Sequence, residues 1–318
     1  MLHPFLFKPL YVERPWGGQK IGRLFGRDSP GNKKIGESWE LVDRPEACNE
    51  ILSGPGIGNG SRQTLHTLWE TRRTEIFGSS APDTARFPVL IKILDAQANV
   101  CVQVHPRPGP GVEPKTEMWY FLETASGAPI YAGFKKGVTR ERFEKALRTP
   151  DLVPLLHTLN PRKGDALFLP SGRIHGLSAG HVFFEVQQNS DTTYRIDDWG
   201  YRDEQGRERP LHLEESMKSI LFDDFEPQFV RSDGEHILDC PYFSVDRACF
   251  NPGESRTRTI APSSFEYHFL ACGELNLDGR AFQRCDNWLI PAGADPCLLE
   301  AGANGAELLI IRWGGMAH

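Results

Sequence analysis

A turn, a short apolar strand and a Pro-x-Gly turn follow one another in Lys163-Gly-Asp-Ala-Leu-Phe-Leu-Pro-Ser-Gly172. The same order of residue types returns in Arg284-Cys-Asp-Asn-Trp-Leu-Ile-Pro-Ala-Gly293. Two copies of one strand-and-turn pattern indicate two similar β-units in the chain. His175 comes three residues after the first copy, and Pro296 comes three residues after the second. Because proline cannot ligate a metal, a metal bound at that position of the first unit would have no counterpart in the second.

Short apolar runs separated by glycine and proline predict that strands dominate the rest of the chain. The runs cover residues 87–94, 100–104, 118–122, 166–169, 182–186, 288–290 and 308–311. Helical periodicity is confined to residues 63–73, to residues 139–148 with Thr139 as a possible N-cap, and to the segment with Leu213, Met217 and Ile220. We therefore expect a mainly β protein whose helices are peripheral. The border between the units is expected near residues 225–235, which gives domains of residues 1–228 and 229–318.

Composition narrows the class of protein. The 318 residues carry a net charge of −6 and contain no run rich in lysine or arginine, so nucleic acid is not an expected partner. Seven cysteines at irregular spacings, without a CxxC pair, indicate a reducing compartment rather than a disulfide framework. No apolar stretch is long enough to cross a bilayer, and the N-terminal apolar run is too short for a signal peptide. We expect a soluble cytoplasmic protein.

Three segments carry residues that could bind a metal. In a strand, residues two apart point to the same face, so Gln103 and His105 would look into one space. Alternation in the next strand places Glu117 on the same face as Trp119, where a carboxylate needs a balancing charge. His175 begins another strand after the Pro-x-Gly turn. Two histidines, a glutamate and a glutamine form a set that suits zinc, and iron, manganese or cobalt would also fit.

These segments also resemble a known family. Gly164-x₅-Pro170-x-Gly172-x₂-His175 resembles the second cupin motif, although Ala179 stands where that motif has asparagine. Further segments resemble the type I phosphomannose isomerases, in their shorter bacterial subclass, over about residues 10–222. They are Arg14-Pro-Trp-Gly-Gly18, Ile35-Gly-Glu-Ser-Trp-Glu40, Pro88-Val-Leu-Ile-Lys92, Gln103-Val-His-Pro106, Lys115-Thr-Glu-Met-Trp-Tyr120 and Tyr194-Arg195.

The resemblance implies a fold and an activity. The fold would be a double-stranded β-helix, the cupin or jelly-roll core, with peripheral helices and a second, smaller cupin-like β domain that lacks a metal site. The activity would be a metal-dependent aldose–ketose isomerisation of mannose 6-phosphate and fructose 6-phosphate through an enediol. One zinc ion per chain would be bound by Gln103, His105, Glu117 and His175. Arg195 would be catalytic, whereas the residues alone favour an ion pair with its neighbours Asp197 and Asp198.

Lys115 and Arg195 are the candidate substrate-binding and catalytic groups. Lys115 lies two residues before Glu117, so it would share the inward face and could act as the base once a nearby zinc lowers its pKa. A metal-bound hydroxide is the alternative base. Arg195 stays protonated and would either stabilise the enediolate or clamp the phosphate. We expect Lys92 and Lys136 to lie in solvent.

Two other functions remain open at this point. One is a non-catalytic sugar-binding cupin that senses metabolites, but no basic helix-turn-helix pattern accompanies the β-units. The other is a cupin enzyme that acts on a different phosphosugar, or an oxygenase that needs redox iron. Because Pro296 stands where a ligand would lie, we also expect the second unit to be structural, covering a sheet edge or a dimer face.

Overall fold

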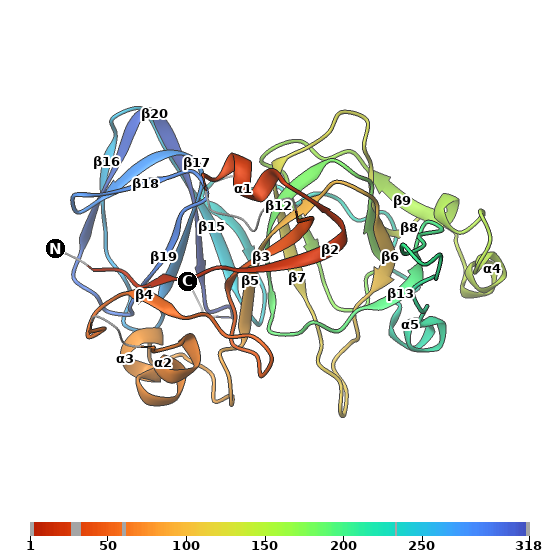
Figure 1. The fold of residues 1–318 in the computed structure, drawn as a ribbon, viewed down its shortest axis with the longest axis horizontal. Coiled ribbons are helices and arrows are strands. Elements are labelled where there is room, and N and C mark those ends of the chain that lie inside the picture. Colours follow the sequence, from red (N-terminus) through yellow and green to blue (C-terminus); the bar gives the residue numbers. More distant parts are fainter. Residues whose placement is uncertain (1–2, 27–32, 59–61, 233, 316–318) are drawn as a thin grey trace.

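The computed structural model describes residues 3–26, 33–58, 62–232 and 234–315. Two β-units lie side by side along the longest axis of the molecule, with short helices at the periphery (Figure 1). The first unit contains β2 (Leu10–Gly18), β3 (Ile35–Leu41), β5 (Val89–Ala96), β6 (Val100–Val104), β7 (Glu117–Glu123), β8 (Ile130–Phe134), β9 (Leu156–Leu159), β10 (Ala166–Leu169), β11 (His175–Leu177), β12 (His181–Gln188) and β13 (Tyr194–Asp197). The second contains β14 (His236–Asp239), β15 (Ser244–Phe250), β16 (Ser255–Arg258), β17 (Glu266–Leu277), β18 (Arg280–Gln283), β19 (Asn287–Ile290) and β20 (Cys297–Arg312). A separate pair joins β1 (Leu6–Phe7) to β4 (Ile51–Ser53).

The helices are short. They are α1 (Lys20–Leu24), α2 (Leu65–Thr71), α3 (Arg73–Phe77), α4 (Arg140–Ala146), the 3₁₀ helix η1 (Val153–Leu155) and α5 (Leu213–Ser219). The helix predicted over residues 63–73 is thus two helices, α2 and α3. Thr139 does cap α4, since its hydroxyl accepts a hydrogen bond from the backbone N–H of Arg142 at 3.2 Å. Among the described residues, no helix has the length and apolar character that crossing a bilayer requires.

Two antiparallel sheets form the first unit. One has the strand order β10-β7-β12-β5-β2-β3, in which β5 also pairs directly with β3. The other has the order β13-β6-β11-β8-β9. Trp119, Phe121 and Phe183 of the first sheet are buried with Leu177 of the second in one apolar cluster, so the two sheets enclose a common interior. This arrangement is the double-stranded β-helix predicted from the sequence. The second unit is one sheet in which β14-β15-β20-β17-β18 are neighbours and β16 and β19 pair with β20 and β17.

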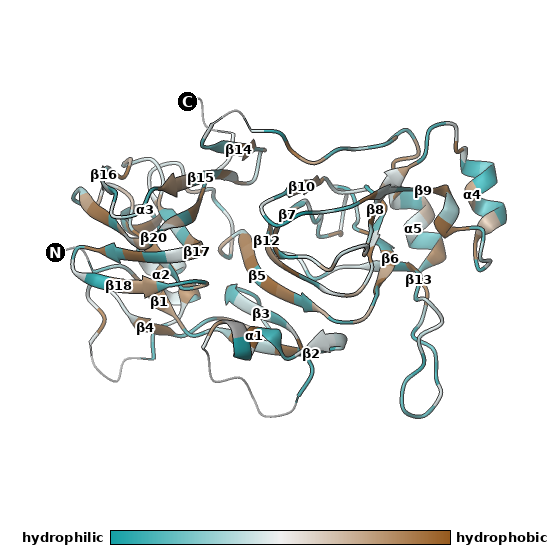
Figure 2. Cartoon of the chain, turned by 90° about the horizontal axis from the view of Figure 1, so that it is seen from above, coloured by the Kyte–Doolittle hydropathy of each residue, from teal (hydrophilic) through white to brown (hydrophobic). Residues whose placement is uncertain are grey.

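The pleat of β7 divides its side chains between two environments. Trp119 and Phe121 point into the interior of the first unit, whereas Met118, Tyr120 and Leu122 belong to the cluster on the opposite face. The alternation predicted for this strand is therefore confirmed, and it places Glu117 on the inward face. Figure 2 shows hydrophobic residues along β5 and β15, and hydrophilic residues over the surface of α4.

The largest apolar cluster lies between the two units. It joins the outer face of the six-stranded sheet to one face of the second unit's sheet and to α2 and α3. Phe184 of β12 meets Phe269 of β17 with ring centroids 4.5 Å apart. Beside them, Trp69 of α2 packs 5.5 Å from Phe87 and 6.0 Å from Trp313 near the C-terminus. Both units thus contribute to one continuous core.

The internal repeat has the same backbone geometry in both copies. Asp165 accepts a hydrogen bond from the N–H of Arg162 at 2.7 Å, and Asp286 accepts one from the N–H of Gln283 at 2.7 Å. The residue before each aspartate has a positive φ, +87° at Gly164 and +68° at Cys285. The following strand then pairs with β7 in the first unit and with β17 in the second. Leu169 lies opposite Glu117 in the first copy, and Ile290 lies opposite Glu266 in the second. Glu266 is therefore the positional counterpart of Glu117.

Candidate metal centre and active site

His105, Glu117 and His175 converge inside the first unit. Their potential ligand atoms lie within 4.8 Å of one another, and all three side chains are almost completely buried. Nε2 of His105 is 3.3 Å from one oxygen of Glu117, and Nε2 of His175 is 3.5 Å from the other. Glu117 comes from the six-stranded sheet, while His175 and the end of β6 at His105 come from the facing sheet. The fold thus brings together residues that lie far apart in the sequence.

Both histidines are held in the tautomer that a metal ligand requires. Nδ1 of His105 donates to the backbone carbonyl of Thr192 at 2.9 Å, and Nδ1 of His175 donates to that of Arg173 at 3.0 Å. The Nε2 lone pairs consequently face Glu117. Burial and the neighbouring cation Lys115 lower the pKa of His105, and burial together with His105 lowers the pKa of His175 to about 3. Neutral imidazoles are the form that binds a metal ion.

Glu117 is the buried anion of the centre. Its side chain is fully buried, and neither carboxylate oxygen takes part in a hydrogen bond of good geometry. Burial by itself would raise the pKa of Glu117, but Lys115 and the two histidines bring it well below its usual value. A buried carboxylate is unfavourable unless a cation balances it, and Lys115, with Nζ 2.7 Å from Oε2, supplies one positive charge here. A divalent ion bound between the three side chains fits this donor set.

Gln103 lies beside this group. Its backbone pairs with that of His175, and its Nε2 is 3.0 Å from Nε2 of His175. Its Oε1 accepts a hydrogen bond from the thiol of Cys101 at 3.2 Å. Because an amide binds a metal through its oxygen, Gln103 would become a ligand when its amide is turned over. The structure therefore places all four predicted ligands together, three with ligand atoms facing one another and one at the edge.

Lys115 reaches into the same group. Its Nζ lies 2.7 Å from Oε2 of Glu117, 3.3 Å from Nε2 of His105 and 3.8 Å from Oε1 of Glu185. Burial would lower the pKa of Lys115, but the Glu117 and Glu185 carboxylates raise it above its usual value. The proximity predicted from the sequence is confirmed. A basic role for Lys115 needs a further cation to offset these carboxylates.

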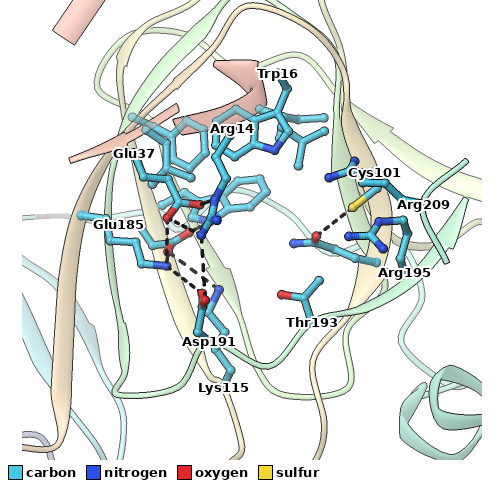
Figure 3. A pocket seen from close by; sticks show the side chains of 17 residues that line it. Arg14, Trp16, Glu37, Cys101, Lys115, Glu185, Asp191, Thr193, Arg195 and Arg209 are labelled. Atoms are coloured by element: carbon cyan, nitrogen blue, oxygen red, sulfur yellow. Dashed lines mark hydrogen bonds and ion pairs between the residues drawn. The ribbon is translucent and has the colours of Figure 1, made fainter. Parts of the chain in front are cut away.

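A cavity of about 260 Å³ opens next to the centre. One of its sides carries a cluster of charged groups that includes Glu37, Glu185 and Asp191 (Figure 3). Nζ of Lys92 lies 3.7 Å from a carboxylate oxygen of each of these three residues. Arg14 adds two hydrogen bonds to Glu37, at 2.9 and 3.1 Å. Burial would raise the pKa of Glu37, but Lys92 and Arg14 lower it to about 2.

Glu185 is a candidate proton acceptor in the wall of the cavity. It is buried in the cavity wall and accepts a hydrogen bond from the indole N–H of Trp119 at 2.9 Å. Burial and the nearby charge of Glu117 raise its pKa to about 7. A carboxylate with such a pKa can take up and release a proton at neutral pH.

Arg195 lines the other side of the cavity. Its backbone lies opposite Gln103 in the β13–β6 pair, and its Nη1 donates to the carbonyl of Pro210 at 2.8 Å. The ion pair with Asp198 expected from the residues alone is long, at 3.8 Å, and Arg195 faces the cavity rather than bulk solvent. Arg209, which the sequence did not single out, lines the same side.

Lys92 corrects one expectation. The sequence predicted a lysine in solvent, yet Lys92 is only 2% exposed and belongs to the cavity wall. The signal was a single lysine in the middle of the apolar run of β5, where its cross-strand neighbours are Trp39 and Glu185. Trp16 also lines the cavity, whereas Trp199 packs against Tyr131 on the outer face.

In the second unit, the carboxylate that corresponds to Glu117 is paired with an arginine. Glu266 is held by Arg258, whose Nε and Nη2 donate to its two oxygens at 2.9 and 2.7 Å. Arg258 lies opposite Cys297, next to Pro296, much as Gln103 lies opposite His175 in the first unit. In the described residues 234–315, no three histidine, cysteine, aspartate or glutamate side chains come close enough to share an ion. An arginine thus supplies the positive charge in this unit.

Replacing Arg258 by methionine is expected to lower the free energy of unfolding by about 2–3 kcal/mol, because Glu266 would stay buried with fewer partners. The value is below that of a fully buried pair, since Arg258 is one-quarter exposed and Arg312 remains 3.3 Å from Glu266. Chemical denaturation measures the change. The double variant R258M/E266Q removes both charges and should recover part of the loss. An R258M protein of unchanged stability, or one that loses its metal, would contradict this account.

Acid is expected to weaken the same contact. Burial would raise the pKa of Glu266, but His268 and Arg258 lower it from 4.5 to about 2. A carboxylate with a lowered pKa stabilises the fold above its unfolded pKa, and that contribution disappears as the pH falls toward the folded pKa. The stability advantage of the wild type over E266Q should therefore shrink by roughly 3 kcal/mol between pH 5 and pH 2. A pH-independent difference between the two proteins would be inconsistent with it.

Comparison with known proteins agrees with this geometry. The family model for the phosphomannose isomerase type I catalytic domain matches residues 5–120. The probable mannose-6-phosphate isomerase GmuF of Bacillus subtilis (strain 168) is 36% identical over 226 residues, which are 69% of each chain. The mannose-6-phosphate isomerase ManA of the same organism is 31% identical over 322 residues, covering 94% of this chain and 96% of that one.

The solved structures extend the agreement to the whole fold. The crystal structure of the mannose 6-phosphate isomerase from Bacillus subtilis superposes with a TM-score of 0.82 at 25% identity, covering 97% of this chain and 99% of that chain. The match includes the second β-unit, for which the sequence alone provided the weakest signal. With a relative of more than 30% identity aligned along nearly its full length, the chain belongs to the type I phosphomannose isomerases.

Proposed function

We propose that this protein interconverts mannose 6-phosphate and fructose 6-phosphate with one zinc ion bound inside the first β-unit. The observation that carries the proposal is the convergence of His105, Glu117 and His175 within 4.8 Å beside a polar cavity. Gln103 completes the ligand set. Zinc suits two imidazoles, a carboxylate and an amide oxygen, and its lack of redox chemistry leaves a sugar intact.

The reaction moves a proton between C2 and C1 of the sugar. A bound divalent ion would polarise the carbonyl and stabilise the negative charge of the enediolate. The chain's own residues then have to accept and return the proton and hold the substrate. Lys115 and Glu185 both face the cavity next to Glu117 and are the candidate proton carriers. Arg195, which lines the cavity, serves as a fixed donor to the developing oxyanion.

We assign the catalysis to residues 1–228 and a structural role to residues 229–318. The Arg258–Glu266 pair at the position that corresponds to Glu117 supports this division. We also propose a cytoplasmic location, which seven cysteines without a disulfide support.

Metal analysis combined with a coupled assay tests the function. Purified protein should contain one zinc ion per chain and convert mannose 6-phosphate to fructose 6-phosphate. Treatment with a chelator should abolish the turnover, and added zinc should restore it. Activity that is indifferent to the chelator, or an absence of turnover in metal-loaded protein, would refute the proposal.

A further inference from the structure

The active-site cavity is asymmetric in charge. The cluster of Glu37, Glu185 and Asp191 lies on one side, and two guanidinium groups, those of Arg195 and Arg209, lie on the other, with open space between them (Figure 3). Arg14, Lys92 and Lys115 balance the carboxylates of the first side, whereas the second side has an excess of positive charge. An anionic group that enters this cavity would therefore be drawn to the second side.

One carboxylate positions both guanidinium groups. Asp198 accepts hydrogen bonds from Nε of Arg209 at 2.8 Å and from its Nη2, and it lies 3.8 Å from Nε of Arg195. The loop that follows β13 contributes the remaining contacts. The carbonyl of Pro210 accepts from Arg195 at 2.8 Å, and the ring of Tyr201 lies 5.1 Å from the Arg209 guanidinium. The segment between β13 and α5 thus fixes two arginines side by side.

Arg195 and Arg209 together carry more positive charge than their carboxylate partner neutralises, and some of their N–H groups have no acceptor. Asp198 is the single carboxylate within ion-pair distance of either guanidinium among the described residues, so one negative charge faces two positive ones. Nε of Arg195 is buried and makes no hydrogen bond. Arg209 uses Nε and Nη2 for Asp198, which leaves Nη1 without a hydrogen bond in the described part of the chain. A buried donor without an acceptor is unfavourable, and an oxyanion in the cavity would satisfy it.

We infer that Arg209 binds the phosphate group of the substrate, while Arg195 beside it keeps the role of donor to the enediolate, and that Asp198 is the residue that positions both arginines. This inference rests on the proposed function and extends it to the residue that selects phosphorylated sugars. A phosphate monoester carries up to two negative charges and three acceptor oxygens, which match the planar fork of the Arg209 guanidinium. The phosphate end of the sugar would then point away from Glu37, Glu185 and Asp191.

Substitution of Arg209 separates this role from a structural one. In R209Q the KM for mannose 6-phosphate should rise about 10- to 100-fold, while kcat changes little, because the contact holds the substrate in both ground and transition states. The dissociation constant of inorganic phosphate, measured by calorimetry, should rise in parallel. R209K keeps the charge but not the planar fork, so its KM should be intermediate.

R207Q is the matched control. Arg207 lies on the same loop and makes an ion pair with Asp203 at 2.8 Å, but it is exposed and does not line the cavity. It should leave both constants unchanged. Values for R209Q within twofold of the wild type, a fall in kcat at unchanged KM, or no detectable phosphate binding by the wild type would overturn the inference.

Different results would refute the isomerase function and the phosphate site. A wild-type protein that does not turn over mannose 6-phosphate but binds phosphate in an Arg209-dependent manner would refute the isomerase and leave the phosphate site standing. A wild-type protein with full turnover, whose R209Q variant binds substrate normally, would refute the phosphate site alone.

Discussion

Replacing Glu117 by glutamine is expected to empty the metal centre and to lower kcat/KM by a factor of about 10³ or more. The carboxylate is the anionic ligand in a fully buried group of three, and the amide of glutamine has the same shape but no charge. Polarisation by the bound ion contributes several kcal/mol to the stabilisation of the transition state, and each 1.4 kcal/mol corresponds to a factor of ten. Metal content and steady-state kinetics measured on the same preparation give the answer.

Glu123 offers a control at the other end of the same strand. It is partly exposed, pairs with Lys20 and Arg284, and lies outside the cavity. E123Q should keep its metal and its activity. An E117Q protein that retains zinc and near-normal turnover would show that Glu117 is a buried structural carboxylate, with Lys115 as its only counter-charge.

Replacing Arg195 by alanine is expected to leave the metal content normal and to lower kcat by about 10² to 10³. The side chain makes no contact with the carboxylate or the imidazoles of the centre, so the ion should stay bound. Its guanidinium is held by the carbonyl of Pro210 and lines the cavity together with Gln103 and Lys115. From this position its charge would stabilise the enediolate without reorganisation.

Lysine at this position tests which property matters. R195K retains the charge but not the fixed donors, so it should recover a part of the activity. Arg202, an exposed residue of the following loop that pairs with Glu208, provides the inert control R202Q. Turnover like that of the wild type in R195A would remove Arg195 from the mechanism, and a loss of metal would give it a structural role.

The faces that carry the candidate ligands could be predicted because they depend on local rules, whereas the gathering of these ligands around one ion was implied by the family resemblance. The two-residue period of a strand places Gln103 and His105 on one face and aligns Lys115 with Glu117, and a short turn fixes the start of the strand at His175. The repeat between residues 163–172 and 284–293 likewise reflects hydrogen bonds within single turns. Such features are encoded by a few neighbouring residues, so they can be found without knowledge of the tertiary pairing.

The other half of the cavity depends on contacts between distant strands. Lys92 meets Glu37, Glu185 and Asp191 because β5 lies between β3 and β12, and nothing in one sequence specifies that order. The sequence did contain one signal, because β3, β5 and β12 each have a charged residue in the middle of a buried strand. These residues are Glu37, Lys92 and Glu185. Such a residue requires a partner of opposite charge, and three of them predict a buried network even before their pairing is known.

The second unit was partly predictable for the same reason. Pro296 shows from the sequence that a ligand is missing there. The identity of the group that replaces the ion, Arg258, depends on the pairing of β16 with β20, which the sequence did not reveal.

The apolar core shared by the two β-units affects how the protein unfolds and loses activity. Phe184 and Phe269, on opposite sides of the boundary, lose their common packing as soon as either β-unit opens. Heat or a truncation that damages the half without ligands would therefore uncover a broad aromatic sheet face on the half that carries them, and such faces associate with one another. Inactivation would then begin in the second β-unit rather than at the active site. The rate at which that unit unfolds would determine the half-life of the active enzyme.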